Sequence, residues 1–170
     1  MRISKSLCKR IALASASTAM AVIGLEVALR WFGAGPLSVN PDQRDLWVYH
    51  SEFGWIGRPN HEGTLDNGYF KVHVAINSQG LRGREATFEK SAAMRRVLVV
   101  GDSFAWGFGV EHAEIFATRL EAALSATEVI NGGMSGYSTD QALLWLRNEG
   151  MRYAPDVVVY VLSGNDDIMN

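Results

Sequence analysis

Three short apolar runs, each followed by a polar cluster, do most to limit what this chain can fold into. The runs lie at residues 97–100, 129–130 and 157–162, the last within a predicted strand at 156–162. Uninterrupted apolar runs of this kind are typical of parallel strands that are covered on both faces. The residues between them have apolar side chains at helical spacing, and Ser138 or Thr139 can cap the second helix. A strand, helix, strand, helix, strand order predicts an α/β domain with a parallel sheet.

The part of the chain before the first run predicts less regular structure. Residues 69–77 alternate between apolar and polar side chains, which predicts a half-buried strand, and residues 77–80 then predict a turn. We expect the aromatic-rich stretch 47–55 to pack on the domain. We expect the charged stretch 82–96 to be a linker or surface structure that leads into the first apolar run.

The amino terminus has the pattern of a membrane anchor. Four basic residues between positions 2 and 10 precede an apolar run at 11–29. A membrane-spanning helix needs about 20 residues, and a basic flank stays on the cytoplasmic side. The sequence therefore predicts a single-pass membrane protein with its body on the extracytoplasmic (periplasmic) side. The alternative is a signal peptide cleaved near the small residues 14–16, which would also export the body.

The balance of charges argues against a nucleic-acid partner. The chain has 16 Lys and Arg against 18 Asp and Glu, a net charge of −2, and its body has no run rich in Lys and Arg. The only cysteine, Cys8, precedes the apolar run, and it has no second cysteine with which to form an internal disulfide. We therefore expect no nucleic-acid binding, and the cysteine content gives no information on the redox compartment.

Polar clusters follow the three apolar runs, at the edge of the sheet where ligand sites lie in open α/β folds. They are Gly101-Asp102-Ser103-Phe104, the glycine- and serine-rich segment 131–138, and Ser163-Gly164-Asn165-Asp166. Taken alone, an Asp-Ser pair in a strand-to-helix turn more often caps backbone N–H groups than attacks a substrate. Three such clusters in succession are more informative than any one of them.

These clusters resemble the first three conserved blocks of the SGNH/GDSL hydrolases. The upstream segment Asn77-Ser78-Gln79-Gly80-Leu81-Arg82-Gly83 is similar to the lead-in of their membrane-anchored bacterial members. The resemblance covers nearly the whole chain. It implies a three-layer α/β/α, flavodoxin-like parallel sheet of the SGNH type, incomplete at the C-terminus and preceded by an N-terminal transmembrane helix.

The same resemblance implies three parts along the chain. Residues 1–36 would be the N-terminal signal anchor or transmembrane segment. Residues 37–94 would be an exported lead-in region with a short β element, and residues 95–170 a partial SGNH hydrolase domain.

The resemblance also implies roles for individual residues. Ser103 would be the nucleophile, which needs a base to take its proton. The oxyanion would be held by the backbone N–H groups of Ser103 and Gly136 and by the side-chain amide of Asn165. Gly136 is preferred over Gly133 because the family's second-block glycine follows a small residue, as Gly136 does. For Gly132 and Gly133 we expect instead turns that require a positive φ angle.

The family's general base has no counterpart in this sequence. In the family it comes from an Asp-x-x-His motif near the carboxyl terminus, where the aspartate orients the histidine. The histidines here are His50, His61, His73 and His112, and none has an aspartate three residues before it. The chain also stops after its third apolar strand, whereas the family sheet has about five. We therefore expect the 170-residue chain to be truncated and inactive by itself.

The predicted function of the complete protein is hydrolysis of O-acyl esters, including those of exported carbohydrates, through an acyl intermediate on Ser103. No metal or organic cofactor is implied. The expected partners are an acylated small-molecule or carbohydrate substrate and the membrane. An alternative that uses the same serine is transfer of the acyl group onto a polysaccharide.

A metal-dependent enzyme is a rival interpretation of the strand ends. Asp102, Asp166 and Asp167 follow strands, and carboxylates are ligands for hard cations such as Mg²⁺ in phosphoryl chemistry. Against this interpretation, the chain lacks a glycine-rich phosphate loop with its lysine. The elbow motif Gly-x-Ser-x-Gly of another hydrolase fold is also absent, because Ala105 occupies the position of its last glycine.

A second rival is a protein without catalytic activity. An anchored, exported module would bind glycan or a protein partner through Trp47, Trp55, Trp106 and neighbouring aromatic residues.

Overall fold

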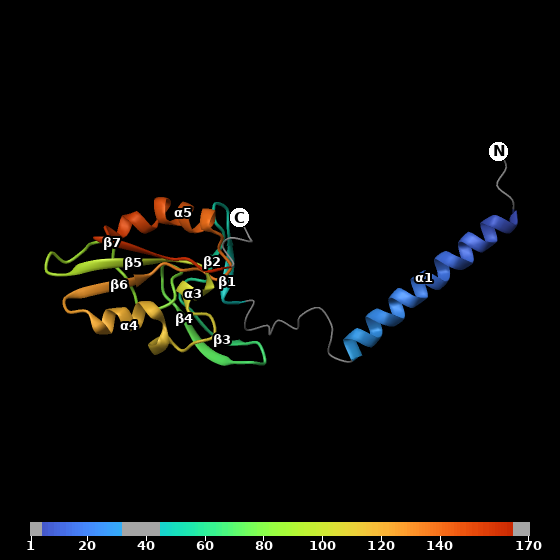
Figure 1. The fold of residues 1–170 in the computed structure, drawn as a ribbon, viewed down its shortest axis with the longest axis horizontal. Helices are drawn as coiled ribbons and strands as arrows, with labels where there is room; N and C mark the ends of the chain where they lie inside the picture. The colour runs from blue at the N-terminus through green and yellow to red at the C-terminus, as the bar shows by residue number, and fades with distance from the viewer. Residues whose placement is uncertain (1–4, 32–44, 165–170) are drawn as a thin grey trace. The chain divides into compact units, whose positions relative to one another are not determined.

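The computed structural model describes residues 5–31 and 45–164, and the chain divides into two compact units, 1–39 and 40–170. The first unit contains helix α1 (Lys5–Trp31), drawn in blue in Figure 1. Its segment Ser6–Trp31 has a mean hydropathy of 1.8. The predicted apolar helix therefore exists and is long enough to cross a membrane, and a signal sequence has the same length and hydropathy.

Polar side chains within α1 bond inside the helix. The hydroxyls of Ser17 and Thr18 each donate to the carbonyl oxygen of Ala14 over 2.9 Å. Near the end of the helix, Arg30 forms an ion pair with Glu26 at 2.7 Å. Internal partners of this kind reduce the cost of placing polar groups in apolar surroundings. The predicted connector at 33–41 lies outside the described residues.

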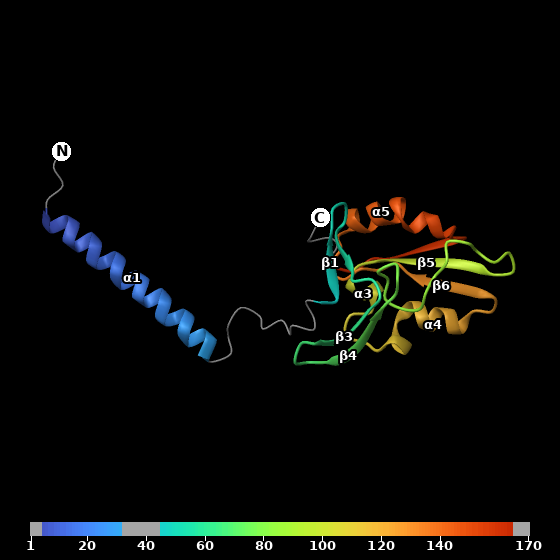
Figure 2. The same cartoon turned by 180° about the vertical axis from the view of Figure 1, so that it is seen from behind.

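Three parallel strands form a sheet in the second unit, in the order β6-β5-β7. Central β5 (Arg95–Gly101) pairs on one side with β6 (Thr127–Asn131) and on the other with β7 (Val157–Val161). Helices α4 (Phe116–Ala123) and α5 (Thr139–Asn148) lie on opposite faces of this sheet in both views (Figures 1 and 2). The predicted α/β fold with a parallel sheet is confirmed.

Short helical turns complete the unit: α3 (Ser103–Trp106), η1 (His112–Glu114) and η2 (Gly150–Tyr153).

The side chains of β5 are buried on both faces of the sheet. Leu98 and Val100 join a cluster that includes Trp145 of α5. Val97 and Val99 join a second cluster, to which α4 contributes. Because successive side chains of a strand point to opposite faces, an uninterrupted apolar run fits a strand with a helix on each side.

Helix α5 begins at the predicted cap. The hydroxyl of Ser138 accepts a hydrogen bond from the backbone N–H of Gln141 at 3.3 Å, and the Gln141 side chain accepts one from the backbone N–H of Ser138 at 3.0 Å. This reciprocal pair satisfies two backbone donors at the helix start.

Two antiparallel hairpins precede the sheet. The first joins β1 (Trp47–His50) to β2 (Gly54–Gly57), and the second joins β3 (His61–Asp66) to β4 (Lys71–Ile76). The alternating pattern predicted β4 correctly, with Val72, Val74 and Ile76 buried. The other three strands were not predicted, because β1 and β2 are only four residues long and β3 has a single buried side chain.

The prediction that 82–96 is a linker or surface structure is wrong at both of its ends. Arg82 is 2% exposed and Arg96 is 1% exposed. Arg96 pairs with Glu128 of β6 at 2.6 Å and donates to the carbonyl oxygens of Phe88 and Tyr153. Irregular backbone leaves carbonyl groups without strand or helix partners, and a buried guanidinium with five N–H donors supplies those partners.

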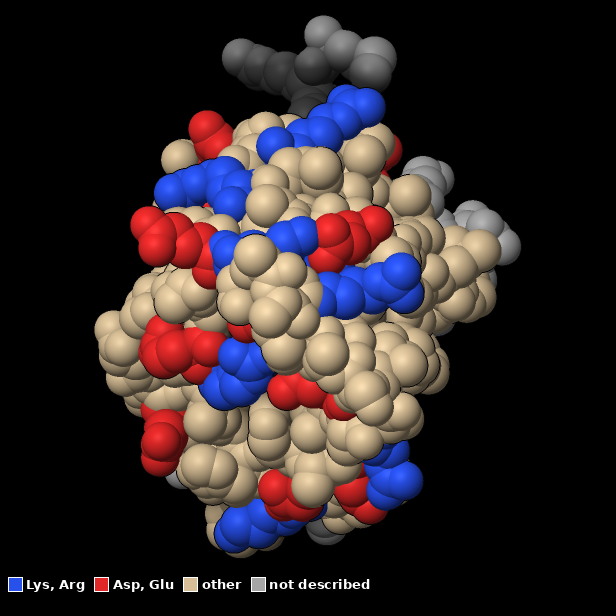
Figure 3. Space-filling model, turned by 90° about the vertical axis from the view of Figure 1, so that its left-hand side faces the viewer, with Lys and Arg blue, Asp and Glu red and all other residues tan. Residues whose placement is uncertain are grey.

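Charged side chains of both signs are interspersed on the face of the domain shown in Figure 3. Ion pairs in the described part of the domain include Arg84 with Glu128 at 3.2 Å and Lys90 with Asp156. No extended area of one sign is visible on this face, which fits the near-neutral charge of the chain.

Candidate active site

The turn between β5 and α3 places Ser103 at the carboxyl edge of the central strand. Asp102 caps α3, because one of its carboxylate oxygens accepts a hydrogen bond from the backbone N–H of Phe104 at 2.9 Å. Its other oxygen accepts one from the hydroxyl of Ser163, just after β7, at 2.7 Å. Asp102 is 5% exposed, so its carboxylate is a buried link between the ends of two neighbouring strands.

Ser103 combines a fixed backbone with an open side chain. Its carbonyl oxygen accepts hydrogen bonds from the N–H groups of Gly107 at 3.0 Å and Phe108 at 2.9 Å. Within the described residues, neither its hydroxyl nor its own N–H has a hydrogen-bond partner. Beside it lies a cavity of about 140 Å³ lined by Ser103, Phe104 and Phe108. The serine is therefore placed to meet a ligand.

The loop after β6 packs directly against α3. Met134 donates its backbone N–H to the carbonyl oxygen of Gly101 at 3.0 Å. A Cβ atom on Gly133 would lie 2.5 Å from the backbone nitrogen of Trp106, and one on Gly132 would lie 2.4 Å from the Trp145 ring. The structure thus brings the first and second polar clusters together, and only glycine fits at these two positions.

The turn prediction for Gly132 and Gly133 is wrong, because neither has a positive φ angle. Their requirement for glycine comes from close packing, as described above. Gly136 has the positive φ, +83°, and its N–H has no partner among the described residues. Its backbone is exposed at the turn, so this N–H is open to a ligand.

The β1–β2 hairpin holds the Gly136 turn in place. The indole N–H of Trp55 donates to the carbonyl oxygen of Ser135 at 3.0 Å, and the Tyr137 hydroxyl donates to the carbonyl oxygen of Trp55 at 2.6 Å. The two rings meet edge to face with centroids 5.6 Å apart, and burial raises the pKa of Tyr137. The aromatic-rich stretch 47–55 was predicted to pack on the domain, but the support that Trp55 gives to the Gly136 turn was not predicted.

The third polar cluster is described only in part. Ser163 contacts Asp102, but Asn165, the predicted side-chain donor, lies outside the described residues, as do Asp166 and Asp167. Of the carboxylates in the metal-binding alternative, Asp102 is already bonded to Phe104 and Ser163. Among residues 5–31 and 45–164 no group of three His, Cys, Asp or Glu side chains is arranged to hold a metal ion.

None of the histidines forms a hydrogen bond to Ser103. His50 accepts from the backbone of Glu52 at 3.3 Å and stacks on Phe53. His73 lies 3.6 Å from Glu62 within the second hairpin. No histidine is therefore placed by a hydrogen bond to accept a proton from the Ser103 hydroxyl.

The tryptophans proposed for a binding surface contribute mainly to packing. Trp106 is 0% exposed and lies 5.6 Å from the Trp47 ring, centroid to centroid. The guanidinium carbon of Arg82 lies over the Trp106 ring, 4.7 Å from its centroid. Trp106 therefore cannot stack on a glycan, and the predicted three-tryptophan surface is wrong on this point.

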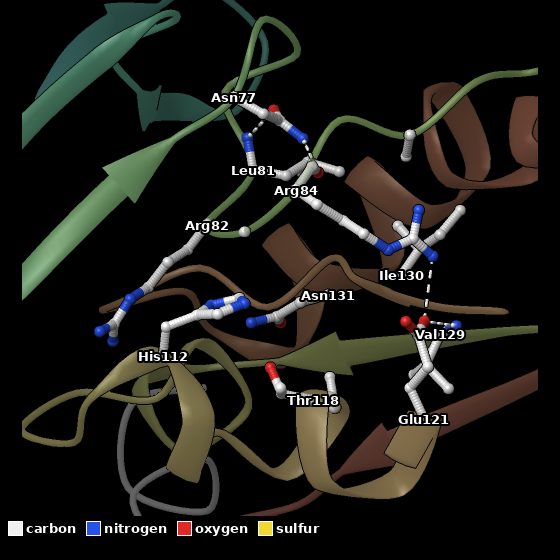
Figure 4. A pocket seen from close by; sticks show the side chains of 13 residues that line it. Asn77, Leu81, Arg82, Arg84, His112, Thr118, Glu121, Val129, Ile130 and Asn131 are labelled. Carbon is white, nitrogen blue, oxygen red and sulfur yellow. Dashed lines mark hydrogen bonds and ion pairs between the residues drawn. The ribbon is translucent and has the colours of Figure 1, made fainter. Parts of the chain in front are cut away.

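A second cavity lies between the lead-in segment and α4, and Figure 4 shows its walls. Its volume is about 60 Å³. In its wall, Arg84 forms an ion pair with Glu121 at 3.0 Å, and the side-chain amide of Asn77 donates to the carbonyl oxygen of Arg84 at 2.9 Å. Its charged groups are already paired across the interface, so it fits a structural junction better than a substrate site.

No protein-family model and no curated protein matches the chain. Among solved structures it is similar to AlinE4, described as an SGNH-hydrolase family esterase, and to a single-substitution mutant of that esterase. Each match is 28% identical, covers 47% of this chain and 46% of the other, and has a TM-score of 0.39. The chain spans about half the length of these structural neighbours, and a TM-score this low does not establish a common fold.

Proposed function

We propose that the protein is a serine-dependent ester hydrolase of the SGNH/GDSL type that acts on O-acyl esters. One observation carries the proposal: Ser103 stands at the carboxyl edge of the central parallel strand, beside a cavity, and its hydroxyl has no hydrogen-bond partner among the described residues. Ligand sites in open α/β sheets lie at this edge. The sequence resemblance of the three polar clusters supports the same conclusion independently of the solved structures.

In this proposal the turn after β5 and the loop after β6 form one catalytic unit. Ser103 attacks the ester carbonyl, and the N–H groups of Ser103 and Gly136 stabilise the oxyanion together with the side chain of Asn165. The open N–H groups of Ser103 and Gly136 support this assignment. Asp102 acts as a positioning residue, because both of its oxygens are occupied by the protein.

The test is hydrolysis of p-nitrophenyl acetate by the protein expressed from its complete reading frame and purified in detergent. Ser103→Ala should lower kcat/KM by about 10³-fold or more, because loss of a catalytic serine removes the covalent route. A fluorophosphonate reagent should label the wild-type protein on the peptide that contains Ser103. Ser91→Ala is the matched control, since Ser91 is an exposed serine before β5.

Two results would contradict the proposal. The serine mechanism requires the Ser103 hydroxyl, so unchanged hydrolysis by Ser103→Ala would exclude it. Loss of activity on adding a chelator would instead favour the carboxylate-metal alternative. Adding a polysaccharide separates hydrolysis from acyl transfer. Hydrolysis releases the free carboxylic acid, whereas transfer produces an acylated polysaccharide.

We also propose that α1 anchors the domain in a membrane with the domain on the extracytoplasmic, periplasmic side. The length and hydropathy of α1 support a span, and the basic residues at and before its amino-terminal end support this orientation. Protease added outside cells with a permeable outer layer should then digest the domain while α1 stays with the membrane fraction. A protected domain would contradict the orientation, and a soluble mature domain would indicate a cleaved signal peptide.

A further inference from the structure

We propose that Trp55 is a positioning residue of the enzyme and that its indole N–H orients the Gly136 N–H toward the oxyanion. This inference rests on the proposed function, in which the Gly136 N–H is an oxyanion donor, and it adds the residue that orients this donor. The indole N–H of Trp55 donates to the carbonyl oxygen of Ser135 at 3.0 Å. That carbonyl and the Gly136 N–H belong to one peptide group, so Trp55 bonds to the same group that would hold the oxyanion.

The geometry of the peptide group passes the effect of this bond to its other end. A trans peptide group is planar, so its C=O and N–H bonds point in opposite directions. No peptide bond among the described residues is cis. The hydrogen bond from Trp55 to the Ser135 carbonyl therefore also sets the direction of the Gly136 N–H. That N–H has no partner among the described residues, and Gly136 is exposed, so the free end of the group is open to a ligand.

The turn that contains this peptide group does not fix its direction without help. It is closed by a hydrogen bond of 3.2 Å from the N–H of Tyr137 to the carbonyl oxygen of Met134. Gly136 has a φ of +83° and Ser135 has no positive φ, which is the pattern of a type II turn. A type I turn closes with the same hydrogen bond but has its central peptide group turned over, and glycine permits both forms. The indole N–H favours the form that is observed.

The hairpin that carries Trp55 is itself docked on this loop. The hydroxyl of Tyr137, a residue that is 3% exposed, donates to the carbonyl oxygen of Trp55 at 2.6 Å. The side chain of Gln141 donates to the carbonyl oxygen of Phe53 at 2.8 Å. A Cβ atom on Gly136 would lie 3.2 Å from the Trp55 ring, so the indole packs directly against the turn. These contacts hold the indole where its N–H meets the turn.

The bond from Trp55 should act mainly on the transition state. Hydrogen bonds in a chain polarise one another, so a peptide group whose carbonyl accepts a bond is a stronger donor through its N–H. Formation and hydrolysis of the acyl-Ser103 intermediate both pass through an oxyanion, which the bound ester lacks. Loss of the Trp55 bond should therefore lower kcat and leave KM nearly unchanged.

The experiment measures kcat and KM for p-nitrophenyl acetate with the protein expressed from its complete reading frame. Trp55→Phe removes the N–H donor and keeps an aromatic ring. We expect kcat to fall by about 10- to 100-fold, less than the roughly 10²- to 10³-fold loss when an oxyanion donor is removed outright. A trifluoromethyl ketone forms an oxyanion adduct with the serine, and its Ki should rise by about the same factor as kcat falls.

The matched control is Trp47→Phe, the same substitution in the same hairpin. Trp47 is also partly buried, but its indole N–H has no hydrogen-bond partner among the described residues. Because no hydrogen bond is lost, kcat and Ki should stay within about twofold of the wild-type values. Urea midpoints of both variants compare their stability with that of the wild-type protein.

A second variant keeps the shape of the indole. Benzothienylalanine introduced at position 55 replaces the indole N–H by sulfur and leaves the two fused rings in place. It should lower kcat and raise the trifluoromethyl ketone Ki as Trp55→Phe does, with a smaller loss of stability. This variant tests the inference even where Trp55→Phe does not fold.

The outcomes separate the inference from the proposed function. Ser103-dependent hydrolysis with wild-type kcat and Ki in the position-55 variants would overturn the positioning role and leave the esterase intact. A higher KM with unchanged kcat would overturn it too, because Trp55 would then bind the substrate. An equal loss of kcat in Trp47→Phe would show that activity follows the stability of the hairpin and not the indole N–H. Hydrolysis that does not depend on Ser103 would overturn the proposed function, and this inference with it.

Discussion

Strands β5 and β7 pair with each other and have similar apolar sequences, yet their side chains differ sharply in burial. In β5, Val97 is 5% exposed and Leu98 is 0% exposed. Their register partners in β7, Val157 and Val158, are 41% and 39% exposed. β5 lies between two strands with α4 and α5 on its faces, whereas β7 has one strand partner among the described residues. An apolar run therefore indicates a strand, and its place in the sheet decides how much that strand stabilises the fold.

The largest expected effect tests what holds the start of β5. Arg96→Ala should lower the free energy of unfolding by about 4 kcal/mol, because it removes a buried guanidinium that pairs with Glu128 and leaves the carbonyl oxygens of Phe88 and Tyr153 without their donor. Arg95→Ala is the control, since the exposed neighbouring arginine should change stability by less than about 0.5 kcal/mol. Urea denaturation of both variants measures the difference. Equal values would show that β5 does not depend on this buried ion pair.

The second prediction compares the two strands directly. Leu98→Ala should cost about 3 kcal/mol, the loss expected for a fully buried leucine that leaves a cavity. Val158→Ala, at the paired position in β7, should cost less than about 1 kcal/mol, because its side chain is already partly in water. The same denaturation experiment applies. A larger loss for Val158 would mean that β7 is covered in solution by something the described residues do not include.

This comparison also explains how much of the fold the sequence could predict. The three parallel strands, the strand at 71–76 and the Ser138 cap all have local signals, namely apolar runs, alternation and a capping box. The first hairpin has no such signal, because its strands are short and its aromatic side chains find their partners far along the chain. The burial of Arg82 and Arg96 also has no signal in the neighbouring sequence, because folding brings their acceptors, carbonyl oxygens of distant residues, close to them.

The candidate site divides in the same way. The position of Ser103 at the end of a central strand follows from the order of strands and could be predicted. The packing of Gly133 on Trp106 could not be predicted, because it depends on the distance between two loops. The support that Trp55 gives to the Gly136 turn spans about 80 residues, and no short-range pattern reports it.

A smaller effect is expected where β7 is tied to the end of β5. Ser163→Ala removes the hydroxyl that donates to the Asp102 carboxylate, a buried acceptor, and should cost about 1 kcal/mol. Because Asp102 positions the turn that carries Ser103, the variant should also lower esterase kcat more than it raises KM. Denaturation and steady-state kinetics on one preparation test both effects. An unchanged kcat with reduced stability would show that the link is structural only.

The smallest effect concerns the α4 layer, which covers one face of β5. Burial acts to raise the pKa of Glu121, but hydrogen bonds from Arg84 and the backbone N–H of Val129, with the charge of Arg84, outweigh it and lower the pKa. A carboxyl group whose pKa is lowered by folding stabilises the protein fully above its ordinary value of 4.5, and that contribution is lost as the pH falls through the folded pKa.

Glu121→Gln removes this contribution and should therefore destabilise the protein at neutral pH, with a difference from wild type that shrinks as the pH falls below about 4.5. Urea midpoints measured from about pH 3 to pH 7 give the curve, and Glu114→Gln, at an exposed position, is the control. A constant difference across this range would mean that the carboxylate charge does not hold α4 against β6. The covered face of β5 would then depend on apolar packing alone, through side chains such as Ala117 and Ile115.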